Sequence, residues 1–304
     1  MLRSALRMVV LASCVVASGC SGAPSDRARP TEPLTWEAFT RSIRSLPDGS
    51  YVVDGDIRVV GDRDLHAYFE AAKAEVDREL SGESVGTVSE PLLLFTVDGV
   101  DSKWAPADKL TLTYCVSSAF GSNTATVIST LDAAGRSWSD RVAVRFQYVE
   151  TATCDNTTNV QFDVVPFVSA TFNAASFFPY YPRSKRELFL SPSAFTDTAG
   201  GRDFVGILRH ELGHALGFRH EHIVLDPPCS APPNPPEPID DPATSTIEGY
   251  RALTEYDVGS VMHYPECRPG GQDQTGYHVS EIDYKGAIGL YGLAAALVMS
   301  VRIN

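Results

Sequence analysis

The run from residue 210 to residue 220 reads His210-Glu-Leu-Gly-His-Ala-Leu-Gly-Phe-Arg-His220. From Asp203 onward, apolar residues recur at three- and four-residue spacings, which predicts a helix. His210 and His214 then lie one turn apart on one face, so both rings can reach a single metal ion. Gly217 comes where the helix has to end, because glycine adopts the left-handed conformation that reverses the chain. His220 can therefore return from the following loop as a third ligand.

This ligand set indicates a catalytic zinc site with one ion. Three neutral imidazoles leave the fourth position of a tetrahedral Zn²⁺ for water. The ion lowers the pKa of that water from about 15.7 to near 7. Glu211 projects about 100° around the helix from His210, so we expect it to act as general base rather than as a ligand. The alternative is a helix whose histidines are ordinary surface or core residues, and the glycine and third histidine in register count against it.

A second motif, Ser260-Val-Met-His-Tyr264, follows about forty residues later. With the first run it resembles the metzincin zinc endopeptidases, in which a methionine, here Met262, lies beneath the zinc. Glu221 after the third histidine and Tyr264 two places after the methionine are similar to the astacin branch. The resemblance implies that Tyr264 is a fifth, displaceable zinc ligand that hydrogen-bonds to the oxyanion. An ordinary half-buried tyrosine is the alternative.

Within the metzincins, the sequence from about Trp104 to Gly292 is most similar to the bacterial HEIGH-type metallopeptidases. This implies an α+β, zincin-like domain with a mixed, mostly parallel five-stranded sheet, a zinc-binding active-site helix, and a smaller irregular C-terminal subdomain with a last helix. A stretch rich in Arg and Asp follows the zinc motif of animal astacins. Here it is replaced by Ile223 to Cys229 and a proline-rich loop, which leaves the substrate cleft undefined. Residues 265–276 should line the first pocket after the scissile bond, where Arg268 either favours an acidic residue or is simply exposed.

Local patterns predict the elements of this domain. Ser280, with Asp283 three residues later, forms a variant of the capping box that begins a last helix. Residues 171–178 are expected to be an edge strand that holds substrate by backbone pairing. The remaining predictions are a helix at 124–139 and strands at 110–116, 142–149, 159–165 and 187–190.

The N-terminus has the features of a bacterial export signal. Arg3 and Arg7 precede an apolar run that is too short to span a membrane. Ala17-Ser-Gly-Cys20 resembles a lipobox, so residues 1–19 are expected to be a signal peptide and Cys20 the lipidated first residue. Simple secretion is the alternative. In either case the protein leaves the cytoplasm, as an envelope lipoprotein or in secreted form.

The mature chain is expected to have three parts: a tether at 20–33, an N-terminal pro-like segment at 34–100 and the metallopeptidase domain at 101–304. Val53-Asp-Gly-Asp-Ile57 resembles the motif by which astacin propeptides place an aspartate on the zinc. A carboxylate is a competent zinc ligand, so Asp56 is predicted to keep a proenzyme latent. A plain Asp-Gly hairpin turn is an equally good interpretation.

Four cysteines remain after export, and an even number in an oxidising compartment indicates two disulfides with three possible connectivities. The metzincin arrangement implies the pairs Cys115 with Cys154 and Cys229 with Cys267. A zinc site made from these cysteines is a weaker interpretation, because no CxxC spacing occurs.

Composition limits the partners. The formal net charge is −13 and becomes −15 once the signal and its two arginines are removed. Such a surface does not bind nucleic acid through charge. We expect a protein or peptide substrate, membrane contact only through the lipid anchor, and a monomer.

Two rival functions remain at this stage. One is a zinc-bearing binding or adhesion module without catalysis, against which the presence of Glu211 speaks. The other is hydrolysis of a non-peptide amide. Of the other histidines, His222 and His263 flank the site, whereas His66 and His278 are expected at the surface.

Overall fold

The computed structural model describes residues 33–62, 65, 66, 69, 73, 92–97, 99–168, 172–224, 248–268 and 276–295, with short gaps at 34, 42, 54–55, 152 and 156–158. The expected signal peptide, Cys20, nearly all of the tether, Cys229 and the proline-rich loop lie outside the described residues. Across the ranges that are described, no helix is long and apolar enough to cross a membrane.

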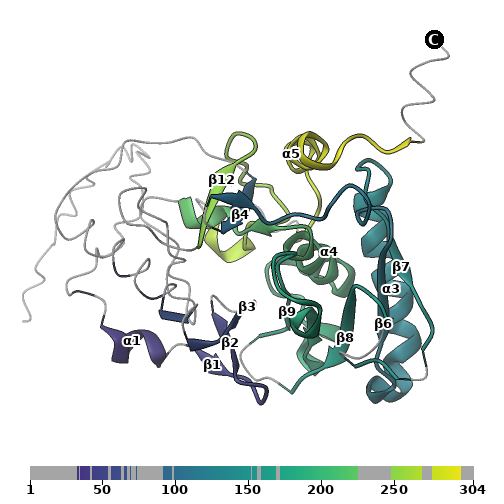
Figure 1. The fold of residues 1–304 in the computed structure, drawn as a ribbon, viewed down its shortest axis with the longest axis horizontal. Coiled ribbons are helices and arrows are strands. Elements are labelled where there is room, and N and C mark those ends of the chain that lie inside the picture. Colours follow the sequence, from purple (N-terminus) through teal and green to yellow (C-terminus); the bar gives the residue numbers. More distant parts are fainter. Residues whose placement is uncertain are drawn as a thin grey trace, which may run out of the picture.

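A five-stranded sheet forms the larger half of the molecule (Figure 1). Its order is β7-β6-β8-β10-β9, and only the edge strand β9 runs antiparallel to its neighbour. The predicted mixed, mostly parallel sheet is therefore confirmed, with an edge strand inside the stretch expected to form one. The strands are β6 (Leu112–Val116), β7 (Phe146–Tyr148), β8 (Phe162–Pro166), β9 (Ala174–Ala175) and β10 (Glu187–Leu190).

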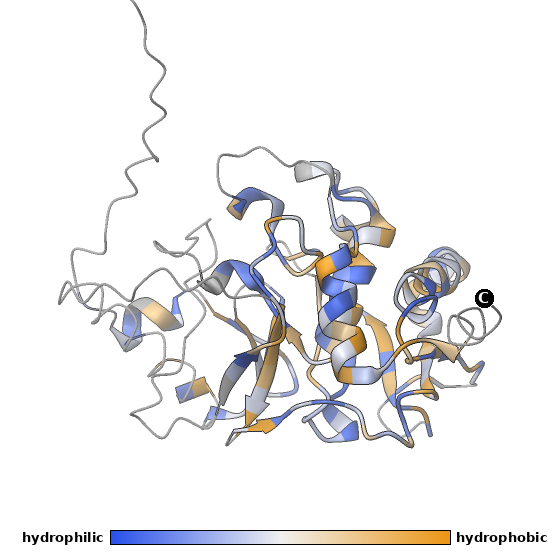
Figure 2. Ribbon diagram, turned by 90° about the horizontal axis from the view of Figure 1, so that it is seen from above, coloured by the Kyte–Doolittle hydropathy of each residue, from blue (hydrophilic) through white to orange (hydrophobic). Residues whose placement is uncertain are grey.

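Two long helices, α3 (Thr124–Ser139) and α4 (Phe204–Ala215), pack against each other and against strands of this sheet. Figure 2 shows hydrophobic residues, in orange, on the strands as well as on the helices. Trp138 of α3 is fully buried, and its indole N–H donates to the carbonyl of Arg209 at 3.1 Å. Asp203 caps the start of α4 by accepting from the Gly206 N–H at 2.6 Å. These contacts fix the position of the helix that carries His210 and His214.

A second sheet lies on the other side of α4, with β4 (Leu93–Val97) between β11 (Phe218–Arg219) and β12 (Glu248–Ala252). A short strand, β5 (Val100–Asp101), also pairs with β4. All five residues of β4 are buried, and four of them are apolar without the alternation of a half-exposed strand. This sheet contains residues of both the expected N-terminal segment, 34–100, and the expected metallopeptidase domain, 101–304.

Truncation of a β4 side chain should therefore destabilise the whole domain. Leu94 is fully buried and packs beside Gly217, just after α4. We expect Leu94→Ala to lower the free energy of unfolding by about 3 kcal/mol, measured by urea denaturation. Val100→Ala is the control, because that side chain is 68% exposed and its loss should change the free energy by less than about 0.5 kcal/mol. Equal effects of the two substitutions would contradict a structural role for β4.

The last helix, α5 (Glu281–Tyr291), begins as predicted. Ser280 accepts from the Asp283 N–H, and the Asp283 carboxylate accepts from the Ser280 N–H, each at 2.9 Å. The same carboxylate accepts from Ser260 Oγ at 2.7 Å and from the Val261 N–H at 2.8 Å. One buried aspartate therefore both caps α5 and holds the 260–264 turn in place.

The N-terminal segment contains α1 (Trp36–Thr40) and a small antiparallel sheet of β1 (Arg44–Ser45), β2 (Ser50–Val53) and β3 (Ile57–Val60). This sheet lies next to β9 in Figure 1, where Ile57 pairs with Ser176 in parallel orientation. Apolar residues of both parts form one buried cluster, made of Leu46, Val52, Phe172, Ala175 and Phe189. The segment is thus packed onto the edge of the larger sheet.

Cys115 and Cys154 form a disulfide with their Cα atoms 5.6 Å apart, which is the first of the two expected pairs. These two cysteines and Asp163 lie close enough to hold a metal ion, but sulfur atoms joined in a disulfide are not thiolate ligands. Cys267 is buried, and its expected partner Cys229 lies outside the described residues.

Candidate metal centre

The three histidines of the first run meet at one buried point. His210 and His214 extend from α4, and His220 follows β11 directly. Gly217 makes this return possible: its φ is 99°, and a Cβ there would lie 2.2 Å from the Ser102 carbonyl oxygen. Any other residue would both strain the backbone and collide with that oxygen.

The spacing of the imidazole nitrogens fits a tetrahedral ion. His220 Nε2 lies 3.0 Å from His210 Nε2 and 3.2 Å from His214 Nε2. Nitrogens bound to tetrahedral zinc at about 2.05 Å lie roughly 3.3 Å apart. The three rings are therefore spaced as the ligands of one ion would be.

The hydrogen bonds of Nδ1 in His210 and His214 indicate that Nε2 of each ring points its lone pair at the centre. His210 Nδ1 donates to the Val261 carbonyl and His214 Nδ1 donates to the Phe218 carbonyl, both at 2.7 Å. A carbonyl oxygen only accepts, so in the neutral rings Nε2 carries no proton. Burial lowers the pKa of His220 to about 3, which keeps that ring neutral. Converging lone pairs repel one another unless a cation binds them, and backbone carbonyls on the far nitrogen are usual for metal ligands.

Asp56 occupies the open side of this cluster. Its Oδ1 lies 3.2 Å from His220 Nε2 and 3.6 Å from His214 Nε2, and its Oδ2 lies 3.3 Å from His210 Nε2. The four side chains form a possible ligand group for one metal ion. The flanking strands β2 and β3 pair antiparallel, as the alternative interpretation expects, and Asp56 nevertheless lies at the histidines.

Glu211 lies at the same centre without belonging to the ligand group. The side chain is buried, and its Oε2 has no hydrogen-bond partner within the part of the chain that the structure describes. Burial and then the charge of Asp56 raise its pKa well above the usual value for glutamate. A buried carboxylate oxygen without a partner has an unmet demand for a donor, and a water molecule in the centre would supply one.

Met262 and Tyr264 come from the turn that Asp283 holds. Met262 is fully buried, and a Cβ on Gly213 of α4 would lie 2.3 Å from its sulfur. The methionine thus packs directly on the helix that carries two of the histidines. Tyr264 donates its hydroxyl hydrogen to Asp56 Oδ2 at 2.6 Å, and its ring lies 4.5 Å from that of His220. Burial and Asp56 raise the pKa of Tyr264 well above 10, so the phenol stays protonated.

The flanking residues are buried. His222 stacks on Tyr264 with ring centroids 4.6 Å apart. His263 Nδ1 donates to the Tyr264 carbonyl at 2.9 Å, and its Nε2 accepts from the hydroxyl of Tyr256 at 2.7 Å. Glu221 is also fully buried and accepts from the Asp257 N–H at 2.9 Å. These contacts support the turn that presents Tyr264.

Arg268 differs from the expectation of an exposed side chain, because it is only 3% exposed. Its guanidinium donates to the carbonyls of Gly276 at 3.0 Å and of Ser260 at 3.3 Å. It therefore ties the turn to the chain before α5. His66 and His278 are exposed, as expected.

Tyr277 is a site residue for which the sequence offered no motif. Its ring centroid lies 4.5 Å from that of His210, and the residue is buried. A single tyrosine between two turns has no spacing that marks it, so only the folded chain shows its place.

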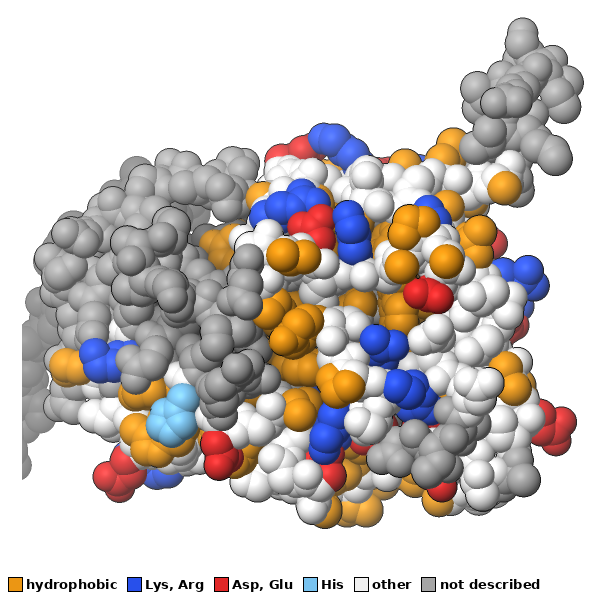
Figure 3. Space-filling view, in the orientation of Figure 1, with side chains coloured by type: hydrophobic (Ala, Val, Ile, Leu, Met, Phe, Trp, Pro, Cys, Tyr) orange, Lys and Arg blue, Asp and Glu red, His pale blue; other side chains and the backbone are white. Residues whose placement is uncertain are grey.

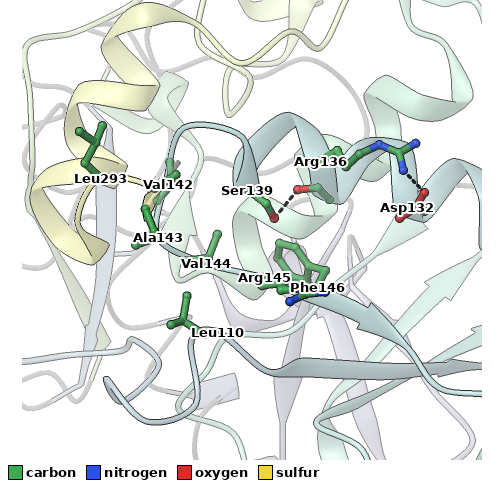
Figure 4. Close-up of a pocket in the computed structure, with 13 residues that line it drawn as sticks. Leu110, Asp132, Arg136, Ser139, Val142, Ala143, Val144, Arg145, Phe146 and Leu293 are labelled. Atoms are coloured by element: carbon green, nitrogen blue, oxygen red, sulfur yellow. Dashed lines mark hydrogen bonds and ion pairs between the residues drawn. The ribbon is translucent and has the colours of Figure 1, made fainter. Parts of the chain in front are cut away.

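The pocket drawn in Figure 4 is a separate feature. It has a volume of about 590 Å³ and lies between α3 and the chain after α5, where Val142 and Leu293 line it. No residue of the histidine cluster lines it. On the face shown in Figure 3, acidic and basic side chains are interspersed rather than gathered in one basic patch.

Comparison with known proteins finds similarity in structure. No family model matches the sequence, and no curated protein matches it. The structure of myroilysin has a TM-score of 0.44 and 20% identity, and the match covers 65% of this chain and 98% of that chain. High choriolytic enzyme 1, a hatching enzyme zinc-protease from Oryzias latipes (medaka fish), has a TM-score of 0.37 and 21% identity, with 62% and 94% covered. At this level of similarity the function has to be inferred from the site residues themselves.

Proposed function

We propose that the chain is a zinc-dependent endopeptidase of the astacin-like metzincin type, made as a latent proenzyme. The observation that carries the proposal is the convergence of the Nε2 atoms of three histidines beside a buried glutamate that is not in the ligand group. His210, His214 and His220 would hold one zinc ion, with Tyr264 as a weaker ligand. A purely structural site has no need of Glu211, which speaks against a non-catalytic binding module.

When bound, zinc supplies an activated water molecule at neutral pH and polarises the carbonyl of the scissile bond. Glu211 accepts a proton from the water as its oxygen attacks the carbonyl carbon. As the carbon–nitrogen bond breaks, Glu211 returns that proton to the leaving nitrogen. Tyr264 donates its hydroxyl hydrogen to the oxyanion that exists after the attack and before the carbon–nitrogen bond breaks.

In the latent form Asp56 takes the place of both water and oxyanion. Its two oxygens lie against the three histidines, and one of them accepts the hydroxyl hydrogen that Tyr264 would give to the substrate. Removal of the part of the N-terminal segment that precedes β4 would open the centre. Export through the signal at residues 1–19, with Cys20 as the lipidated residue, is part of the same proposal.

Metal analysis and zinc removal test the proposal. We expect the purified full-length chain to hold one zinc ion, His214→Ala to lose it, and the exposed His278→Ala to keep it. In a chain opened by Asp56→Ala, chelation should stop cleavage of an unfolded protein and added zinc should restore it. Cleavage that persists without zinc, or no cleavage by any zinc-loaded variant, would contradict the proposed function.

A further inference from the structure

Arg58 of β3 is buried against the edge of the five-stranded sheet. Its guanidinium nitrogen Nη1 lies 2.9 Å from Glu187 Oε2 and donates to the Lys185 carbonyl at 2.6 Å. The guanidinium carbon lies 5.1 Å from the centre of the Phe189 ring. An acid, a carbonyl oxygen and an aromatic ring thus surround one basic side chain whose exposed fraction is zero.

The other partners of Arg58 belong to its own segment. Nε donates to Ser50 Oγ at 2.9 Å, and the guanidinium forms an ion pair with Asp48. When the N-terminal segment leaves, Asp48 and Ser50 leave with it. Glu187, the Lys185 carbonyl and Phe189 remain on the larger unit, as a receptor without its cation. We name these three groups the β10 acidic receptor.

The backbone beside Arg58 occupies an edge that another peptide strand can use. The Ser176 N–H donates to the Asp56 carbonyl at 2.9 Å, and the Arg58 N–H donates to the Ser176 carbonyl at 3.3 Å. An extended peptide adds to a sheet edge through such main-chain bonds, while its side chains give specificity. Asp56 lies at the reactive centre, and Arg58, two residues further along the chain, lies against Glu187. A peptide strand bound in the same place would therefore put a side chain about two residues from the reactive centre against Glu187.

Electrostatics favour a basic occupant of this receptor. Burial raises the pKa of Glu187, and the charge of Arg58 opposes that rise. A partly buried carboxylate without an ion-pair partner is unfavourable in free energy. A substrate that restores the ion pair therefore binds more tightly than one that does not. Arginine and lysine both carry the required charge, and a guanidinium also stacks on an aromatic ring.

We propose that the β10 acidic receptor is a specificity subsite, which selects peptides with arginine or lysine two or three residues from the bond that is cut. The proposal rests on the proposed function, because it assigns a substrate class to the same centre. Arg58 then has two roles, since it anchors the N-terminal segment and fills the subsite until that segment leaves.

The test uses the full-length chain with Asp56→Ala and Arg58→Ala. Loss of the arginine removes the cation between Asp48 and Glu187 and leaves Asp48 paired with Lys185 alone, which weakens the hold of the segment on the subsite. The substrates are peptides that differ only by arginine, lysine, glutamine or leucine at each of three positions on both sides of the cleaved bond. We expect kcat/KM to favour the basic residues at one position by at least about tenfold.

Adding Glu187→Gln should reduce that preference to less than about twofold, whereas Glu255→Gln, at an exposed glutamate, should leave it unchanged. Cleavage without a basic preference, or a preference that survives Glu187→Gln, would overturn the subsite and leave the proposed function standing. If no peptide is cut, the proposed function fails. Calorimetric titration of the same chain carrying Glu211→Ala then decides the subsite separately: selective binding of the arginine peptide supports it, and equal binding of the arginine and glutamine peptides refutes it.

Discussion

Replacing Glu211 with glutamine is expected to lower kcat for peptide hydrolysis about 10²- to 10⁴-fold, while the chain still holds one zinc ion. Glutamine keeps the shape of the side chain but cannot accept the proton of the attacking water. The three histidines keep their hydrogen bonds to the Val261 and Phe218 carbonyls and to one another, so the metal should stay. The expected result is a folded, zinc-loaded and nearly inactive protein.

The measurement compares cleavage of an unfolded protein by chains that also carry Asp56→Ala, with zinc content determined on the same samples. Glu255→Gln is a suitable control, because that glutamate is exposed and pairs only with Lys285 at 2.7 Å among the described residues. If Glu211→Gln cleaved as fast as its parent, the general-base role would be refuted. If it lost zinc as well as activity, Glu211 would have a part in holding the metal.

The sequence predicted the larger sheet and its helices well because each has a strong local pattern. The helix at 124–139 and the strand at 187–190 were predicted with their observed bounds, and α4 begins one residue after Asp203. The histidines were predicted to meet because helical spacing and one glycine determine their directions. The predicted α+β fold class is confirmed, because the strands and helices that define it have strong local patterns.

Long-range contacts have no such local pattern. β4 joins β11 and β12 across more than one hundred residues, and only the apolar run from Leu92 to Phe95 signals a strand buried on both faces. The pairing of Arg58 with Glu187 and the burial of Arg268 depend on which distant segments of the chain meet, and no spacing in the sequence encodes that. Asp56 was found through its motif, but the motif alone fitted a turn equally well.

Asp56→Ala should raise the activity of the unprocessed chain by about two orders of magnitude, which is the second large effect that we expect. The carboxylate competes with substrate from within the same molecule, so its effective concentration at the centre is in the millimolar range. Its Oδ2 accepts from Tyr264 at 2.6 Å, and its Oδ1 lies 3.2 Å from His220 Nε2, so it fills the positions that water and oxyanion need. Alanine leaves the hairpin strands in place but removes the ligand.

Rates of cleavage of an unfolded protein by unprocessed wild type, Asp56→Ala and Asp62→Ala would measure this effect. Asp62 is the matched control, because it is an exposed aspartate of the same segment that contacts Tyr51 rather than the histidines. A rise with Asp62→Ala as large as that with Asp56→Ala would mean that loosening the segment, and not removing the ligand, opens the site. Equal rates for wild type and Asp56→Ala would reduce Asp56 to a turn residue. A rise specific to Asp56 would mean that the segment blocks the centre through this carboxylate, while the contacts of Arg58 with Glu187 hold it there.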